Sequence, residues 1–258
     1  MRQMQRFFVE IAFHGGAYHG WQAQPNASTV QETLDGALST VCRQQVATVG
    51  CGRTDTGVHA KQLYAHFDLV EPRQNPEDPN FWYRLNALLP HDISVKRIFA
   101  VPHGAHARFD ATQRWYEYHI HIGKDPFRRG LSWQVRSFPD LDKMNEAARA
   151  LFDYRDFSCF SKSNTQTFTN NCTISHATWS RIGDCGVFTI AADRFLRNMV
   201  RAIVGTLLEI GYGDKPVSHI HEVVSSKSRS MAGMSVPAHG LYLARVLYPY
   251  VNQLDSPA

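Results

Sequence analysis

The strongest constraint on the fold is an alternation of apolar and polar residues that recurs along the first hundred residues. Nearly every second residue is apolar in 7–13, in 63–69 and in 93–101. A period of two is typical of strands, because successive side chains of a strand point to opposite faces. A shorter stretch at 46–51 also has strand character. The sequence therefore predicts four strands in this half of the chain.

Two helices are predicted between these strands. Thr29 and Glu32 form a Thr-x-x-Glu capping pattern, and apolar residues then recur at helical spacing through about Cys42. A second helix begins near Phe81 and leads to Pro90. The resulting order, β-α-β-β-α-β, predicts a ferredoxin-like unit.

The second half repeats that order without a detectable sequence period. Its predicted elements are a strand at 115–122, a helix at 142–152 capped by Asp142, strands at 173–182 and 187–192, a long apolar helix at 195–210, a short helix at 217–226 and a strand at 241–247. We expect an α+β protein of two ferredoxin-like halves, with mixed, largely antiparallel sheets joined across a central cleft. The predicted domains are 1–105 and 106–258.

Composition excludes several classes of protein. The chain has 258 residues, of which 43% are hydrophobic and 19% charged, a composition typical of a globular protein and not of a disordered one. No stretch approaches the roughly 18 consecutive apolar residues of a membrane span. The first six residues lead into the first strand without a cleavage site. We expect a cytoplasmic protein that does not interact with a membrane.

Basic and aromatic residues are concentrated in one window, 91–136. This window holds eight Lys and Arg against four Asp and Glu, and the difference equals the whole net charge of +4. It also holds seven aromatic residues. Basic groups interleaved with aromatic ones suit a surface that neutralises phosphates and stacks on bases. The window alone is equally compatible with a solvated pair of strands that has a half-buried aromatic face.

The cysteines and histidines do not indicate a metal site. Five cysteines form no Cys-x-x-Cys pair, and we interpret them as reduced, mostly structural thiols. His119 with His121, or His219 with His221, would share a face if the segment is a strand, but neither pair has a convincing carboxylate or thiol ligand nearby in the sequence. A metal site needs three or four converging ligands, so we expect none.

The loop between the second and third predicted strands reads Gly-Arg-Thr-Asp-Thr-Gly-Val-His-Ala over 52–60. Two glycines bracket Arg53 and Asp55, an arrangement suited to a rigid loop that presents charge into a cleft. Two other interpretations stay open from the residues alone. Thr54 or Asp55 could bond its own backbone in a structural turn, or Asp55 and His59 could form an acid–base pair.

This loop resembles the Gly-Arg-Thr-Asp-x-Gly-Val-His-Ala signature of the tRNA pseudouridine synthase A family. Further segments resemble motifs of the same family in the same order along nearly the whole chain. They are Gly20–Gln24, Asn86–Pro90, Ala107–Phe109 with Arg114–Tyr118, Phe195–Gly205, and Gly240–Leu243. Six ordered matches make a chance resemblance very improbable, and the family fold is similar to the two predicted halves.

The resemblance implies an isomerase that converts uridine to pseudouridine at positions 38 to 40 of the tRNA anticodon stem-loop, acting as a homodimer without a cofactor or metal. It implies that Asp55 is the catalytic carboxylate, that Arg201 is its basic partner, and that Tyr116 stacks on the flipped uracil, although Tyr116 and its neighbour Tyr118 could each be plain sheet core. An unpaired arginine within the apolar run of the long helix would be costly, which favours a paired Arg201.

RNA contacts are expected from five arginines. Arg53 resembles the family residue that enters the anticodon stem-loop as the target base swings out, with a salt bridge inside the loop as the alternative. The others belong to the basic window: Arg108, Arg114, Arg128 and Arg129.

The chain departs from the family pattern in places. Phe13, His14 and Gly15 stand at the end of the first strand where Tyr-Asp-Gly is common, and Thr56 stands where Ala is usual. Residues 158–171 hold fewer arginines than the family leads us to expect.

Two rival functions remain. A non-catalytic RNA-binding module would not need Asp55, and an enzyme for a small metabolite would not need the basic window.

Overall fold

The computed structural model describes residues 4–162 and 168–251, which form two compact units. Unit 1 contains the chain up to Thr112 and its last part from Leu243, and unit 2 contains Gln113–Tyr242. The sequence placed the boundary between two domains at residue 105 and assigned everything after it to the second domain. In the structure the chain returns to unit 1 for its final strand.

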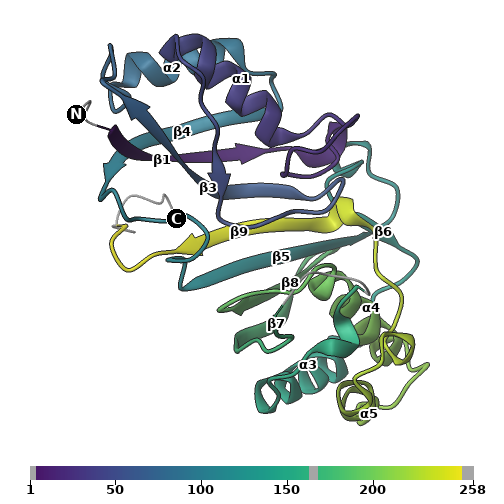
Figure 1. Ribbon diagram of the computed structural model, residues 1–258. Coiled ribbons are helices and arrows are strands. Elements are labelled where there is room, and N and C mark those ends of the chain that lie inside the picture. The colour runs from purple at the N-terminus through teal and green to yellow at the C-terminus, as the bar shows by residue number, and fades with distance from the viewer. Residues whose placement is uncertain (1–3, 163–167, 252–258) are drawn as a thin grey trace. The chain divides into compact units, whose positions relative to one another are not determined.

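Unit 1 is built on an antiparallel sheet. Its strands are β1 (Met4–Phe13), β2 (Val49–Gly50), β3 (His59–Val70) and β4 (Ile93–Val101), in the order β4-β1-β3 with β2 paired to β3. Two helices, α1 (Val30–Cys42) and α2 (Pro79–Leu88), lie together on one face of this sheet (Figure 1). The element order predicted for the first half is therefore the observed one, although β2 is shorter than the predicted strand at 46–51.

The two faces of this sheet are packed by different parts of the chain. The alternating residues Phe7 and Val9 are buried, as expected for the face that the helices cover. On the other face, Phe8 lies against the rings of Tyr248 and Tyr250, whose centroids are 5.3 and 6.1 Å away. These tyrosines follow β9 (Leu241–Leu247), which succeeds β3 in the sheet order. The end of the chain thus completes the core of unit 1.

Unit 2 contains the strands β5 to β8 and three helices. The strands β5 (Gln113–Ile122), β8 (Cys185–Ala192) and β7 (Ile174–Ile182) are antiparallel neighbours in that order, and β6 (Trp133–Val135) pairs in parallel with β5. Helices α3 (Leu141–Ala150), α4 (Met199–Gly211) and α5 (His219–Ser226) gather below this sheet in Figure 1. The parallel and antiparallel pairings together make the protein an α+β fold with a mixed sheet.

Two predictions for this half need correction, and one strand was missed. The cap of α3 is Asp140, whose carboxylate accepts from the backbone N–H groups of Asp142 and Lys143, so the prediction of Asp142 as the cap was wrong. Helix α4 begins at Met199 and not at residue 195, because Asn198 takes a left-handed conformation at φ 68°. Strand β6 was not predicted, since three residues are too few to show a period.

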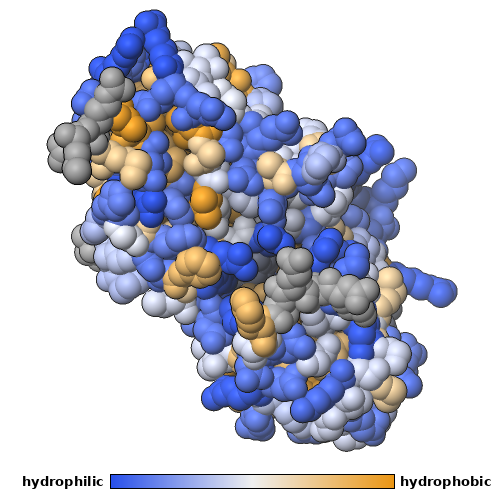
Figure 2. Space-filling view, in the orientation of Figure 1, coloured by the Kyte–Doolittle hydropathy of each residue, from blue (hydrophilic) through white to orange (hydrophobic). Residues whose placement is uncertain are grey.

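No helix in residues 4–162 and 168–251 is long and apolar enough to cross a membrane. Blue, hydrophilic residues dominate the face shown in Figure 2, and orange is confined to small areas of it. Among the exposed large apolar side chains are Phe109 and Phe127, with 74% and 89% of their surface accessible. Both belong to the basic window, so two of its aromatic residues are available for contact with a partner.

Candidate active site

Asp55 lies on the loop that connects β2 to β3. Its backbone carbonyl accepts a hydrogen bond from the Val58 amide at 3.1 Å, which closes a turn, and Gly57 within that turn has φ +80°. The Gly57 amide donates to the Tyr18 carbonyl at 3.3 Å. A positive φ favours glycine, so the second glycine of the motif has a backbone role. Asp55 itself is half-buried, whereas Arg53 on the same loop is exposed.

The segment 14–21 holds this loop from one side. The Trp21 amide donates to the Thr54 hydroxyl at 3.0 Å. Gly20, at φ +90°, approaches so closely that a Cβ there would lie 2.2 Å from the Thr54 carbonyl oxygen. The Thr54 side chain therefore accepts from a distant backbone amide and does not cap its own turn, whereas the same interpretation for Asp55 stays open.

A second close approach fixes the far end of the loop. A Cβ on Gly15 would lie 2.0 Å from the Val58 carbonyl oxygen, and the Gly15 amide donates to Nδ1 of the buried His59 at 3.0 Å. His59 Nδ1 is thus an acceptor, which places the ring proton on Nε2. The imidazole of His14 lies 4.4 Å from that of His59, centroid to centroid. His59 therefore anchors the loop, which accounts for its place in the motif.

Tyr18 fixes the anchoring segment itself. Its hydroxyl donates to the Asp92 carboxylate at 2.6 Å, and burial together with this carboxylate raises the pKa of Tyr18. The Asp55 loop thus rests on a segment that is in turn tied to the turn before β4. Spacing in the sequence gave no sign of these contacts, because they join residues more than thirty positions apart. The only available signal was the pair of glycines, Gly15 and Gly20.

Arg201 lies on α4 in unit 2, two residues after the start of the helix. Its Nε donates to the Val236 carbonyl at 2.7 Å, and the Val236 amide donates to the Arg201 carbonyl at 3.3 Å. Gly205, one turn further along α4, lies against the same segment, because a Cβ there would lie 1.9 Å from the Met234 carbonyl oxygen. Arg201 is therefore held by two hydrogen bonds to the backbone of Val236.

The two tyrosines of β5 differ in burial, which bears on the choice between them. Tyr118 is fully buried and donates to the Pro237 carbonyl at 2.9 Å, and burial raises its pKa. Tyr116 is half-buried, and its ring meets Phe195 edge-to-face with centroids 5.0 Å apart. Tyr118 is thus a core residue, and Tyr116 is the one of the pair with accessible surface.

The remaining arginines occupy different settings. Arg108 is exposed, and its guanidinium lies 5.8 Å from the centroid of the Phe109 ring. Arg114 donates to the Asp193 carbonyl at 2.7 Å, and Arg128 pairs with Asp125 at 3.0 Å. Arg129 is exposed. Arg108 belongs to unit 1 and the other three to unit 2, so the basic window spans both units.

One histidine of each pair contacts a glutamate side chain. His119 pairs with Glu117 at 2.8 Å, and His219 pairs with Glu222 at 2.9 Å, so each pair does have a carboxylate partner, contrary to expectation. His219 also lies on helix α5 and not on a strand. Among the described residues, no group of three or more His, Cys, Asp and Glu side chains is placed to hold a metal, and the five cysteines are free thiols.

The geometry defines a carboxylate on an immobilised loop, together with surface arginines and exposed aromatic rings. This combination suits an enzyme that acts on a nucleic acid. A family model described as tRNA pseudouridine synthase matches residues 147–249.

Curated relatives are similar over nearly the entire chain. The chain is 50% identical to the tRNA pseudouridine synthase A of Parabacteroides distasonis, over 95% of this chain and 97% of the relative. It is also 50% identical to that of Porphyromonas gingivalis, over 95% and 98%. Identity to the one from Bacillus licheniformis is 40%, over 94% and 99%. The chain belongs to the tRNA pseudouridine synthase A family, whose members isomerise uridine to pseudouridine in tRNA.

Proposed function

We propose that this protein converts uridine to pseudouridine at positions 38 to 40 of the tRNA anticodon stem-loop, with Asp55 as the catalytic carboxylate. The observation that carries the proposal is the fixed geometry of the Asp55 loop. Two glycines of the segment 14–21 pack directly against the backbone of this loop, and the segment also donates a hydrogen bond to it. A carboxylate acts as a nucleophile or base only when its position is held against the reacting atoms. Family membership supplies the reaction, and this loop supplies a group that can perform it.

The reaction exchanges one bond for another without any external reactant. The glycosidic bond from N1 to the ribose C1′ breaks, the uracil rotates, and a bond from C5 to C1′ forms while the C5 proton leaves and N1 gains one. The atoms and charges balance, so the protein needs no cofactor for redox or group transfer. Asp55 assists by attacking the nucleoside or by removing the C5 proton.

The target base must leave the stack before it can react. Extrusion costs a few kcal/mol, which stacking on an aromatic ring and hydrogen bonds to the base edge recover. Tyr116 supports this role because it keeps accessible ring surface while Tyr118 is buried. Arg53 is exposed on the Asp55 loop, which suits a contact with the RNA from which the base was extruded.

Arg201 is proposed as the basic partner of Asp55. Its Nε is engaged by the Val236 carbonyl, so its η nitrogens are the donors that would serve a carboxylate. A guanidinium close to a carboxylate favours the ionised form, which is the reactive one. Asp55 belongs to unit 1 and Arg201 to unit 2, and their pairing stays a prediction.

Further elements of the proposal rest on the sequence, some through the resemblance and others through the element order, the composition and the basic window. The enzyme acts as a homodimer in the cytoplasm, each unit follows the ferredoxin-like plan, and the backbone of the anticodon stem-loop is bound by the remaining arginines, namely Arg108, Arg114, Arg128 and Arg129. The stretch 158–171 is expected to differ from the family in its RNA contacts, and residues 163–167 of that stretch lie outside the described residues.

Mapping of pseudouridine in cellular tRNA tests the proposed function. Cells that lack this protein should lose pseudouridine at positions 38 to 40 of their tRNAs, and expression of the wild-type chain should restore it. Expression of Asp55→Asn at the same level should not. Retention of all three modifications in cells without the protein would contradict the proposal.

Substitution of Arg201 tests the basic partner. Arg201→Leu should abolish activity, because the carboxylate then lacks the charge that keeps it ionised, and Arg201→Lys should reduce activity because a lysine lacks the planar fork. Arg149→Leu, at an exposed position of α3, is the matched control and should be fully active. An Arg201→Leu enzyme that keeps the wild-type turnover would remove Arg201 from the mechanism.

A further inference from the structure

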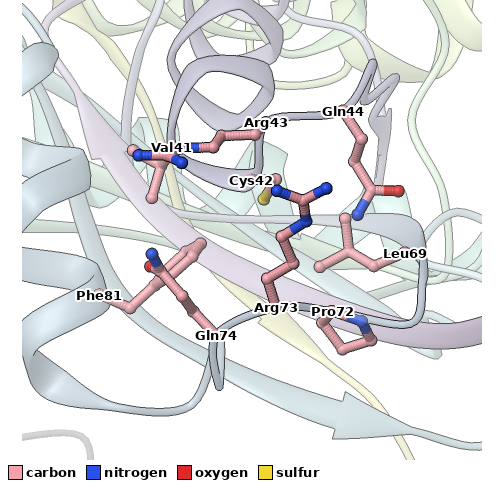
Figure 3. A pocket seen from close by; sticks show the side chains of 9 residues that line it. All are labelled: Val41, Cys42, Arg43, Gln44, Leu69, Pro72, Arg73, Gln74 and Phe81. Atoms are coloured by element: carbon pink, nitrogen blue, oxygen red, sulfur yellow. The ribbon is translucent and has the colours of Figure 1, made fainter.

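Unit 1 contains a pocket that the proposed catalytic residues do not use. It has a volume of about 200 Å³ and lies between the end of α1, the end of β3 and the segment 72–74. Figure 3 shows the Arg73 side chain reaching into the middle of the pocket toward Cys42, while that of Arg43 runs along one wall toward Val41. This volume is several times the ~30 Å³ of a water molecule, so a phosphate group fits.

The charge of this pocket is positive and locally uncompensated. No Asp or Glu lines it, and neither Arg43 nor Arg73 makes an ion pair with any described residue. Arg84, just outside, donates to the Gln74 side chain at 2.6 Å and adds a third positive charge nearby. The site therefore favours an anion.

A simpler interpretation is that these arginines only stabilise the C-terminus of α1. Arg43 is the C-cap of that helix, in a left-handed conformation at φ 52°. A helix end carries only about half a negative charge, so two guanidinium groups exceed what it can neutralise. The nearby backbone groups are also satisfied without them, since the Arg43 amide donates to the Thr40 carbonyl and the Val70 amide donates to the Gln44 side chain. The guanidinium N–H groups remain as donors for a ligand.

The pocket and the Asp55 loop lie at opposite ends of one helix. The amide of Val30, the first residue of α1, donates to the Gly20 carbonyl at 3.2 Å, and Gly20 packs against Thr54 of the loop. Thirteen residues of α-helix span about 20 Å. A polyanion that reaches the Asp55 loop therefore has a second cationic site on the same unit, at the other end of a helix about 20 Å long.

We propose that Arg43 and Arg73 bind a backbone phosphate of the tRNA substrate in this pocket. The inference rests on the proposed function, which makes tRNA the polyanion that this unit meets. Guanidinium groups match the geometry of phosphate oxygens by paired N–H donors, and the apolar walls formed by Val41 and Pro72 limit competition from water. The contact extends the RNA path beyond the anticodon stem-loop contacts already proposed.

Salt-dependent tRNA binding tests this assignment. At about 0.1 M salt, Arg43→Ala/Arg73→Ala should weaken binding of a full-length tRNA transcript five- to tenfold and make the log–log salt slope shallower by about 1 to 2, as expected for lost phosphate contacts. The control Arg149→Ala/Lys215→Ala removes the same charge at exposed positions outside both the pocket and the basic window. Arg43→Lys/Arg73→Lys should keep most of the affinity.

Three results would overturn or redirect the proposal. If the double alanine variant binds tRNA as the control does, the pocket is not an RNA contact. If it binds tRNA as the control does but loses stabilisation by guanosine monophosphate, measured as the thermal unfolding midpoint, the pocket takes a free phosphate ester and the tRNA assignment is wrong. If guanosine monophosphate has no effect on any variant and tRNA binding is unchanged, the arginines are a helix cap only.

A turnover measurement distinguishes a loss of phosphate binding in the pocket from a loss of catalytic activity. The double alanine variant should keep the wild-type turnover at saturating tRNA, because the Asp55 loop is intact. The proposed function would be wrong if the wild-type enzyme forms no pseudouridine at positions 38 to 40. If the double variant still loses tRNA affinity in that case, the assignment of the pocket as a phosphate site remains supported.

Discussion

Two loops of this protein present charged residues that are proposed to contact the substrate, Asp55 on one and Arg128 with Arg129 on the other. The two loops differ in the contacts that hold them in place. The Asp55 loop is fixed by tertiary contacts, since Gly20 meets the Thr54 backbone at a distance that leaves no room for a Cβ. The loop 123–131 is fixed mainly by local contacts, with one distant hydrogen bond at its end from the Tyr242 hydroxyl to the Leu131 carbonyl. The Asp125 carboxylate accepts from the Phe127 amide at 2.9 Å and pairs with Arg128, and a Cβ on Gly130 would meet nothing within 4 Å.

The difference follows from what each loop is proposed to do. A carboxylate that attacks a nucleoside must be placed to within a fraction of an ångström, because a misplacement of about 1 Å can cost 100-fold in rate. The charge of a surface arginine attracts the phosphate backbone over several ångströms, so a shift of about 1 Å in such a loop costs far less than a shift of the reacting carboxylate. Rigid packing therefore suits the catalytic role proposed for the Asp55 loop, and a more open, mainly locally ordered loop suits the binding role proposed for 123–131.

Gly20→Ala should displace the Asp55 loop and should cause the largest loss of kcat among these variants. Its Cβ would overlap the Thr54 carbonyl oxygen, so the loop must shift, and we expect kcat to fall on the order of 100-fold. Gly130→Ala is the matched control, because Gly20 at φ +90° and Gly130 at φ +74° pay a similar backbone penalty of about 1 kcal/mol. Steady-state kinetics would compare kcat in the two variants, and melting curves would compare their stability. Equal losses of kcat in both variants would contradict the comparison.

Thr54→Val should have a smaller effect on the same loop. Valine keeps the shape of threonine but cannot accept the hydrogen bond from the Trp21 amide, which costs about 1–2 kcal/mol in the fixed state. We expect kcat to fall about tenfold with KM little changed, and Thr54→Ser to restore the wild-type rate. A serine variant as slow as the valine variant would show that the hydroxyl does not position the loop.

Arg128→Ala/Arg129→Ala should change binding and not chemistry. We expect a loss of tRNA affinity of about fivefold at 0.1 M salt, a shallower salt slope, and an unchanged kcat at saturating tRNA. Nitrocellulose filter binding across a salt series would measure the slope. If slope and affinity match those of the wild type, the basic window is a solvated face and the RNA lies elsewhere.

The sequence predicted elements where local signals were strong. The cap at Thr29, the helix it begins and the strand 93–101 are all observed, because capping and a period of two are local properties. The prediction was less exact where two residues carried the same signal, as Asp140 and Asp142 both can cap α3. It also failed at Asn198, where a left-handed residue delays the start of α4.

The candidate site also combines features that have a local sequence signal with features that have none. The motif of residues 52–60 identified Asp55, but nothing in its spacing predicted that Gly15 and Gly20 would press against its backbone. Contacts across more than thirty residues depend on how the strands pair, and a glycine that permits close approach has the same appearance in sequence as one in a turn. The assignment of Asp55 to the site therefore stays a prediction from the motif, whereas the contacts that fix its loop could not be predicted from the sequence.

The most direct test of the account is single-turnover pseudouridine formation by Asp55→Asn on an anticodon stem-loop transcript. Asparagine nearly preserves the volume of the side chain and removes its charge, so the loop should keep its contacts while the reactive group is lost. The account predicts no detectable pseudouridine, with RNA affinity within about tenfold of the wild type. Appreciable turnover by this variant would show that the immobilised loop does not carry the catalytic group.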